Sequence, residues 1–144
     1  MNQYASEHAM SCSRITAHFQ GIWVPMVTPF RSGELDLDAA QQLASDLAAS
    51  GIDGLVVCGT TGEAAMLDAR EHSLLLDSVL EAVGPRFPVV MGVGGSDTRQ
   101  VVATVQRYND HPLAGLLISA PAYVRPSQDG IVRHFQAIAG ATDQ

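Results

Sequence analysis

The stretch VVCGTTGEAAML, residues 56–67, begins as an apolar run, breaks into a loop of glycines and hydroxyl-bearing residues, and becomes apolar again. A short apolar run before a glycine-rich turn is typical of a buried strand of a parallel sheet. Comparable runs occur at residues 22–27, 55–58, 89–91 and 116–118, each followed by a turn and a segment with helical spacing. The sequence therefore predicts an α/β fold made of four βα units.

Signals at the starts of the helical segments support this order. Asp68 is followed three residues later by Glu71, which is the spacing of a capping box at the second helix. Ser96 and Ser127 precede the third and fourth helical segments, and serine is a preferred N-cap residue. Each unit thus has a strand, a loop and a marked helix start.

Composition limits the functions open to the chain. Its 144 residues are 47% hydrophobic, enough for one globular domain with a core. A net charge of −7 disfavours nucleic acid and anionic membranes as partners. No apolar stretch approaches the ~20 residues that span a bilayer. All eight basic residues are arginine, so the chain contains no lysine.

The first residues differ from the rest of the chain. Residues 1–18 have neither the basic nor the apolar region of a signal peptide. We expect a flexible leader there and a single domain over residues 19–144. Cys12 and Cys58 have no paired spacing, which favours a reducing compartment and a cytoplasmic protein.

Two architectures are built from repeated βα units. A doubly wound open sheet of four or five strands would be complete at this length, whereas a (β/α)8 barrel typically needs about 250 residues. Length alone therefore favours the open sheet. Both architectures bind ligands at the carboxyl ends of their strands, so the βα loops are the places to look for chemistry.

The loop of residues 59–63 is the first candidate. Gly59 and Gly62 allow a close backbone approach, and Thr60 and Thr61 offer N–H and O–H groups that could converge on a carboxylate. The alternative is that this loop is only a tight turn between strand and helix. It is not a nucleoside-triphosphate loop, because the lysine of that motif is missing.

A second candidate loop follows the fourth predicted strand. Tyr123 could relay a proton and Arg125 could pair with a carboxylate, although an ordinary proline-bounded loop would explain the same residues. The five histidines show no ligand spacing, so we predict no metal and no cofactor. Cys58 lies in a buried run and is expected to be a core residue rather than a nucleophile.

Taken in order, three motifs resemble one known family. GIWVPMVTPF (residues 21–30), DGLVVCGTTGE (residues 53–63) and YVRPSQ (residues 123–128) are similar to the dihydrodipicolinate synthase / N-acetylneuraminate lyase family. The resemblance covers about residues 19–143. It implies a (β/α)8 TIM barrel of class I aldolase type, of which this chain would be the first four βα units, a half-barrel with parallel strands.

The resemblance also implies roles for particular residues. Thr61 would hold the pyruvate carboxylate beside Gly59 and Gly62, and Thr60 would join a proton relay. Tyr123 would be the relay tyrosine that reaches into a neighbouring subunit, which implies a homo-oligomer. The family's lysine, which forms a Schiff base with pyruvate, has no counterpart here, so this chain alone is not expected to catalyse the reaction.

The predicted function is the N-terminal portion of a pyruvate-dependent lyase resembling 4-hydroxy-tetrahydrodipicolinate synthase, which joins pyruvate to an aldehyde such as aspartate semialdehyde. Alternatives are another pyruvate or 2-keto-3-deoxy sugar acid aldolase of the family, or a non-catalytic protein that binds a small carboxylate. Of the pocket through which lysine inhibits many bacterial synthases, only His72 matches. Four residues differ, so no lysine feedback is expected: Ala69, Ser96, Gln100 and Ala122.

Overall fold

The computed structural model describes residues 19–144, so the predicted leader of residues 1–18 lies outside the described part. The strands and helices, in chain order, are β1 (Trp23–Pro25), β2 (Phe30–Arg31), β3 (Glu34–Leu35), α1 (Leu37–Ala49), β4 (Gly54–Val57), α2 (Ala69–Val83), β5 (Val89–Val93), α3 (Thr98–Arg107), β6 (Gly115–Ile118) and α4 (Gln128–Ala139). The four predicted apolar runs correspond to β1, β4, β5 and β6. Within residues 19–144, no helix is long and apolar enough to cross a membrane.

The main sheet has the order β1-β4-β5-β6, and every neighbouring pair is parallel. Each strand therefore pairs with the strand of the next βα unit along the chain. A doubly wound sheet reverses its strand order and takes helices on both faces. The order here has no reversal, as in the wall of a barrel, so the expectation from length alone was wrong.

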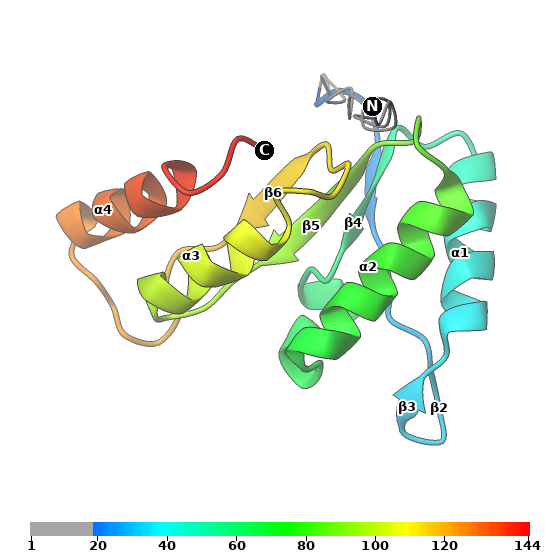
Figure 1. Cartoon of the computed structure of the whole chain (residues 1–144), viewed down its shortest axis with the longest axis horizontal. Coiled ribbons are helices and arrows are strands. Elements are labelled where there is room, and N and C mark those ends of the chain that lie inside the picture. Colours follow the sequence, from blue (N-terminus) through cyan, green and yellow to red (C-terminus); the bar gives the residue numbers. More distant parts are fainter. Residues whose placement is uncertain (1–18) are drawn as a thin grey trace, which may run out of the picture.

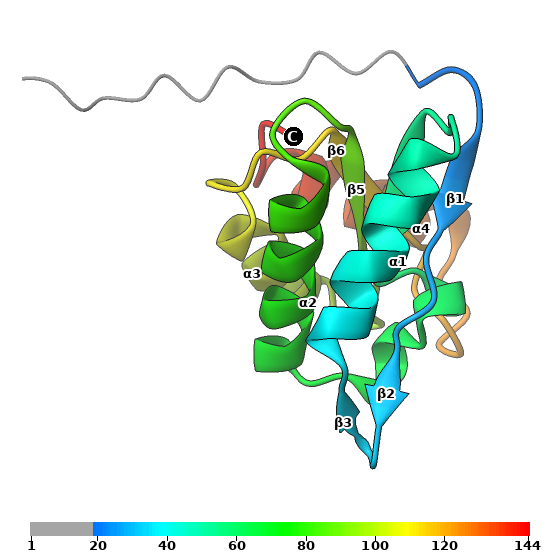
Figure 2. The same ribbon diagram turned by 90° about the vertical axis from the view of Figure 1, so that its right-hand side faces the viewer.

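The two faces of the sheet differ, because side chains alternate along each strand. All four helices contribute residues to a core on one face of the sheet. The helices α1 and α2 lie on the side of β1 and β4, and α3 and α4 lie on the side of β6 (Figures 1 and 2). The core on this face includes Leu55, Val57, Val89, Met91, Ala44, Leu75, Val105 and Ile138. The opposite face carries Val56, Gly92 and Leu117, and Leu117 is 53% exposed. The helices therefore cover only one of the two faces of the four-stranded sheet.

The helix caps confirm two of the three predictions. Asp68 and Glu71 form the capping box of α2, and the Ser127 side chain accepts a hydrogen bond from the backbone of α4. The prediction for α3 was wrong by one residue, because its N-cap is Asp97, whose carboxylate accepts from the Arg99 amide. The Ser96 hydroxyl instead donates to the Ala122 carbonyl in the loop after β6.

A short hairpin, β2–β3, was not predicted from the sequence. Its two-residue turn places Ser32 at φ 55° and Gly33 at φ 88°, as tight hairpin turns require. The Arg31 guanidinium lies 2.6 Å from Asp36, which is also the N-cap of α1. The hairpin projects from the rest of the fold in both views (Figures 1 and 2).

Candidate functional site

The candidate site lies at the carboxyl edge of the four-stranded sheet. Because all four strands are parallel, the loops that follow them emerge at the same edge. The predicted residues Gly59, Thr60, Thr61 and Gly62 follow β4, and Tyr123 follows β6. The topology thus brings every predicted site residue to one edge, with β5 between the two loops.

The loop after β4 is more ordered than a simple turn. It forms two successive 3-10 turns, Thr60–Gly62 and Ala64–Met66. The Gly62 amide donates to the Gly59 carbonyl at 3.0 Å, and the Glu63 amide donates to the Thr60 carbonyl at 3.1 Å. Thr60 and Thr61 are exposed, and their amides open the first turn, where they have no partner within it.

Both glycines of this loop are buried, unlike the two threonines between them. A side chain at Gly62 would approach the Met26 carbonyl oxygen to 2.9 Å. The Thr28 hydroxyl donates to the Gly62 carbonyl at 2.6 Å in a buried hydrogen bond. The loop after β4 is thus fixed to the loop after β1. Thr28 was not among the predicted site residues, although it belongs to the first motif of the family resemblance.

Cys58 connects β4 to this loop in a strained conformation. Its φ is 56°, in the left-handed region that non-glycine residues rarely occupy. A side chain at Gly92 on β5 would overlap the Cys58 carbonyl group and lie 3.0 Å from the Gly59 nitrogen. Burial raises the pKa of the Cys58 thiol to about 12. Cys58 is therefore a core residue, as predicted, and its backbone shapes the loop.

The loop after β6 holds Tyr123 in a second strained conformation. Tyr123 has a φ of 66°, and the Val124 amide donates across it to the Ala122 carbonyl at 2.8 Å, as in a γ-turn with positive φ. Its side chain is 100% exposed. Arg125 is also left-handed, at φ 44°. No hydrogen bond of the described residues joins Tyr123 to Thr60 or Thr61, so the structure does not bring these side chains into contact.

Backbone strain is concentrated at this edge. Among the described residues, five non-glycine residues have positive φ, and four of them belong to the loops after β4 and β6. Such residues cost about 1–3 kcal/mol each and tend to cluster at functional sites. This strain could not be predicted from the sequence, because none of the four is the glycine or asparagine that usually marks a left-handed position.

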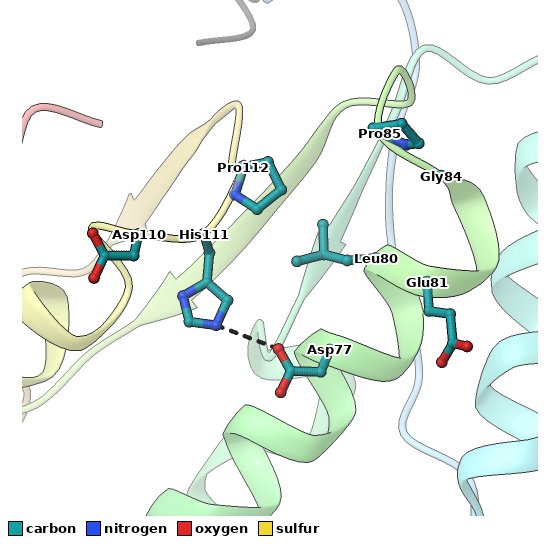
Figure 3. A pocket seen from close by; sticks show the side chains of 8 residues that line it. All are labelled: Asp77, Leu80, Glu81, Gly84, Pro85, Asp110, His111 and Pro112. Carbon is teal, nitrogen blue, oxygen red and sulfur yellow. Dashed lines mark ion pairs between the residues drawn. The ribbon is translucent and has the colours of Figure 1, made fainter. Parts of the chain in front are cut away.

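Other kinds of site find less support. Within residues 19–144, no group of three or more His, Cys, Asp or Glu residues is arranged to hold a metal ion. An open hollow of about 370 Å³ lies between the end of α2 and the loop that precedes β6 (Figure 3). His111 and Asp77 line it and lie 3.3 Å apart. This hollow opens at the amino edge of the sheet, away from the loops that follow the strands.

Comparisons with known proteins agree on one family. The family model described as the Dihydrodipicolinate synthetase family matches residues 18–144. The 4-hydroxy-tetrahydrodipicolinate synthase of Acidothermus cellulolyticus is 45% identical over 134 residues, which cover 92% of this chain and 44% of that protein. The 4-hydroxy-tetrahydrodipicolinate synthase 1 of Streptomyces coelicolor is 48% identical over 118 residues, covering 81% and 39%.

Solved structures give the same result. Dihydrodipicolinate synthase from Aquifex aeolicus superposes with a TM-score of 0.83 at 34% identity, over 87% of this chain and 43% of that chain. The lysine-bound enzyme from Cyanidioschyzon merolae superposes with a TM-score of 0.81 at 37% identity, over 87% and 43%. The chain thus spans less than half the length of the relatives it matches. The four parallel strands therefore form a half-barrel, which confirms the predicted fold.

Proposed function

Because the chain belongs to the dihydrodipicolinate synthetase family, we propose that it supplies the carboxylate-binding half of the active site of a pyruvate-dependent lyase. The substrates of the whole enzyme would be pyruvate and an aldehyde such as aspartate semialdehyde. The observation that carries the proposal is the fixed loop after β4, which displays two exposed threonines at the carboxyl edge of the half-barrel. Thr61 would bind the pyruvate carboxylate, with Gly59 and Gly62 keeping the backbone close.

Proton transfer would use hydroxyl groups. Thr60 would pass a proton between the bound substrate and a tyrosine, a task that positioned hydroxyls perform in general acid–base catalysis. Tyr123 suits the tyrosine role from a neighbouring subunit, since its side chain is fully exposed and makes no described hydrogen bond within the chain. A homo-oligomer in which Tyr123 reaches another subunit's site is therefore part of the proposal.

The Schiff base would need an amine from outside these residues. No side chain here can supply it, because all eight basic residues are arginine. The remaining length of a family member, more than half of the relatives' chains, would carry that group. We accordingly expect residues 1–144 to bind pyruvate without forming an imine at a side chain.

Binding of pyruvate can be measured by ligand-observed NMR with the chain and with Thr61→Val. A hydrogen bond to a charged group contributes about 1.5–3 kcal/mol, so the variant should bind at least about tenfold more weakly. Thr104→Val makes the same change on α3 and should bind as the unchanged protein does. Equal binding by the unchanged protein and Thr61→Val would refute the role of Thr61.

Treatment with pyruvate and borohydride tests the missing amine separately. Intact mass and peptide mapping should show no pyruvate adduct at any side chain. An adduct on a side chain of residues 1–144 would overturn the proposal that the amine comes from elsewhere. Binding without an adduct and without activity in a completed barrel would instead favour a non-catalytic carboxylate-binding protein.

We further propose that lysine does not regulate this protein. The ring of His72, which alone matches the lysine pocket, already bonds the Ala64 carbonyl oxygen through Nε2 at 3.0 Å. A thermal-shift titration with lysine should leave the melting temperature unchanged. A saturable rise in that temperature would contradict the proposal.

A further inference from the structure

The conformation at Tyr123 needs support from outside its own loop. A left-handed tyrosine at the centre of a γ-turn is intrinsically disfavoured, so neighbouring groups must hold it there. The Tyr123 side chain offers no such support, because it is fully exposed. The restraint must therefore act through the backbone on either side.

Two hydrogen bonds converge on the carbonyl oxygen of Ala122. The Val124 amide donates to it at 2.8 Å from within the turn. The Ser96 hydroxyl donates to the same oxygen at 2.7 Å from the loop after β5. A carbonyl oxygen has two lone pairs, so these two donors complete its hydrogen bonding and fix its direction.

The loop that carries Ser96 is itself well anchored. The next residue, Asp97, caps α3 by accepting from the Arg99 amide at 3.0 Å. The residue after Asp97 is Thr98, whose hydroxyl pairs with Nδ1 of the buried His134 at 2.8 Å and so joins α3 to α4. Ser96 is thus held between a strand end and a capped helix start, and it can act as a fixed donor.

We propose that Ser96 is a positioning residue for Tyr123: its hydroxyl holds the Ala122 carbonyl so that the γ-turn keeps Tyr123 left-handed and aimed outward. The functional meaning of this inference rests on the proposed relay role of Tyr123. Without the hydroxyl, the Ala122 carbonyl loses one partner, and the turn relaxes toward negative φ. The direction of the tyrosine side chain then changes, although the residue itself is intact.

NMR of the full chain tests the proposal with Ser96→Ala and with Ser96→Thr, which keeps the hydroxyl. In Ser96→Ala, the HN–Hα coupling of Tyr123 should change to that of a negative φ. The Val124 amide should exchange about fivefold faster, as expected for the loss of one net hydrogen bond. Ser96→Thr should keep both values. Ser50→Ala, which removes a comparable hydroxyl-to-carbonyl bond at the end of α1, should leave both unchanged.

An unchanged coupling and exchange rate in Ser96→Ala would overturn the proposal. If Ser96→Thr changed the Tyr123 coupling and the Val124 exchange rate as Ser96→Ala does, the effect would not follow the hydroxyl and the proposal would also be wrong. Equal changes in Ser50→Ala would overturn it in the same way. These measurements need no substrate. A failure of pyruvate binding would therefore count against the proposed function and leave the positioning of Tyr123 by Ser96 unaffected. Unchanged NMR values in Ser96→Ala would count against the positioning and leave the proposed function unaffected.

Discussion

Replacing Gly92 with alanine tests how the candidate site is built. The added Cβ would overlap the Cys58 carbonyl oxygen, lie 2.7 Å from the Cys58 carbonyl carbon and lie 3.0 Å from the Gly59 nitrogen. All three are backbone atoms, so no side-chain rotation can relieve the overlap. Favourable carbon contacts begin at about 3.5 Å, so β4 and β5 would have to separate locally by about 1 Å.

The expected loss of stability is at the upper end for overpacking, about 3 kcal/mol. For a domain of this size, that corresponds to a fall of about 10 °C in melting temperature, measurable by circular dichroism. The shift would also move the loop that carries Thr60 and Thr61, so pyruvate binding should weaken.

Gly94→Ala is a matched control two residues away. Its added Cβ would lie 2.8 Å from the Ser119 hydroxyl oxygen, a side-chain atom that can rotate away. It should therefore lower the melting temperature much less than Gly92→Ala does. A melting temperature for Gly92→Ala equal to that of the unchanged protein or of Gly94→Ala would refute the reasoning.

Three further predictions concern single residues. Thr28→Val removes the buried donor to the Gly62 carbonyl and should lower the free energy of unfolding by about 1–3 kcal/mol in urea titrations, whereas Thr28→Ser should not. Hydrogen bonds from the backbone of α2 lower the pKa of Asp68 below its ordinary 3.8, so its contribution to stability is present at higher pH and is lost as the pH falls below about 4. In Asp68→Asn, the melting temperature should therefore fall less steeply as the pH is lowered below about 4. A fall as steep as that of the unchanged protein would contradict this prediction. With its pKa raised to about 12, the Cys58 thiol should react with a maleimide in a Cys12→Ser background only after denaturation, and rapid labelling of the native protein would show that it is accessible.

The fold was largely predictable because its signals are long-range patterns. Four apolar runs, each followed by helical spacing, located the main strands and helices, and only the three motifs taken together indicated a half-barrel rather than a complete open sheet. The hairpin β2–β3 was missed because strands of two residues show no periodicity. The cap of α3 was misplaced because Ser96 and Asp97 can both cap, and only the backbone path decides between them.

The loops that carry the candidate site residues were predictable, but the contacts that support these loops were not. Two glycines and two threonines indicated the loop after β4 as a candidate site, and Tyr123 and Arg125 indicated the loop after β6. The supports from Thr28, Ser96 and the Cys58 backbone join loops that are distant in sequence. Sequence patterns along one segment carry no information on such contacts, which arise only once the strands are placed side by side.

The sequential order of the sheet also bears on how the chain folds as it is synthesised. Because β4 pairs with β1, β5 with β4 and β6 with β5, each strand that leaves the ribosome finds its partner already made. Pairing between successive units limits each loop closure to a single βα unit, which keeps its entropy cost lower than closure across several units would be. The half-barrel can therefore grow one βα unit at a time from the amino end, with the newest strand always offering the edge on which the next one adds.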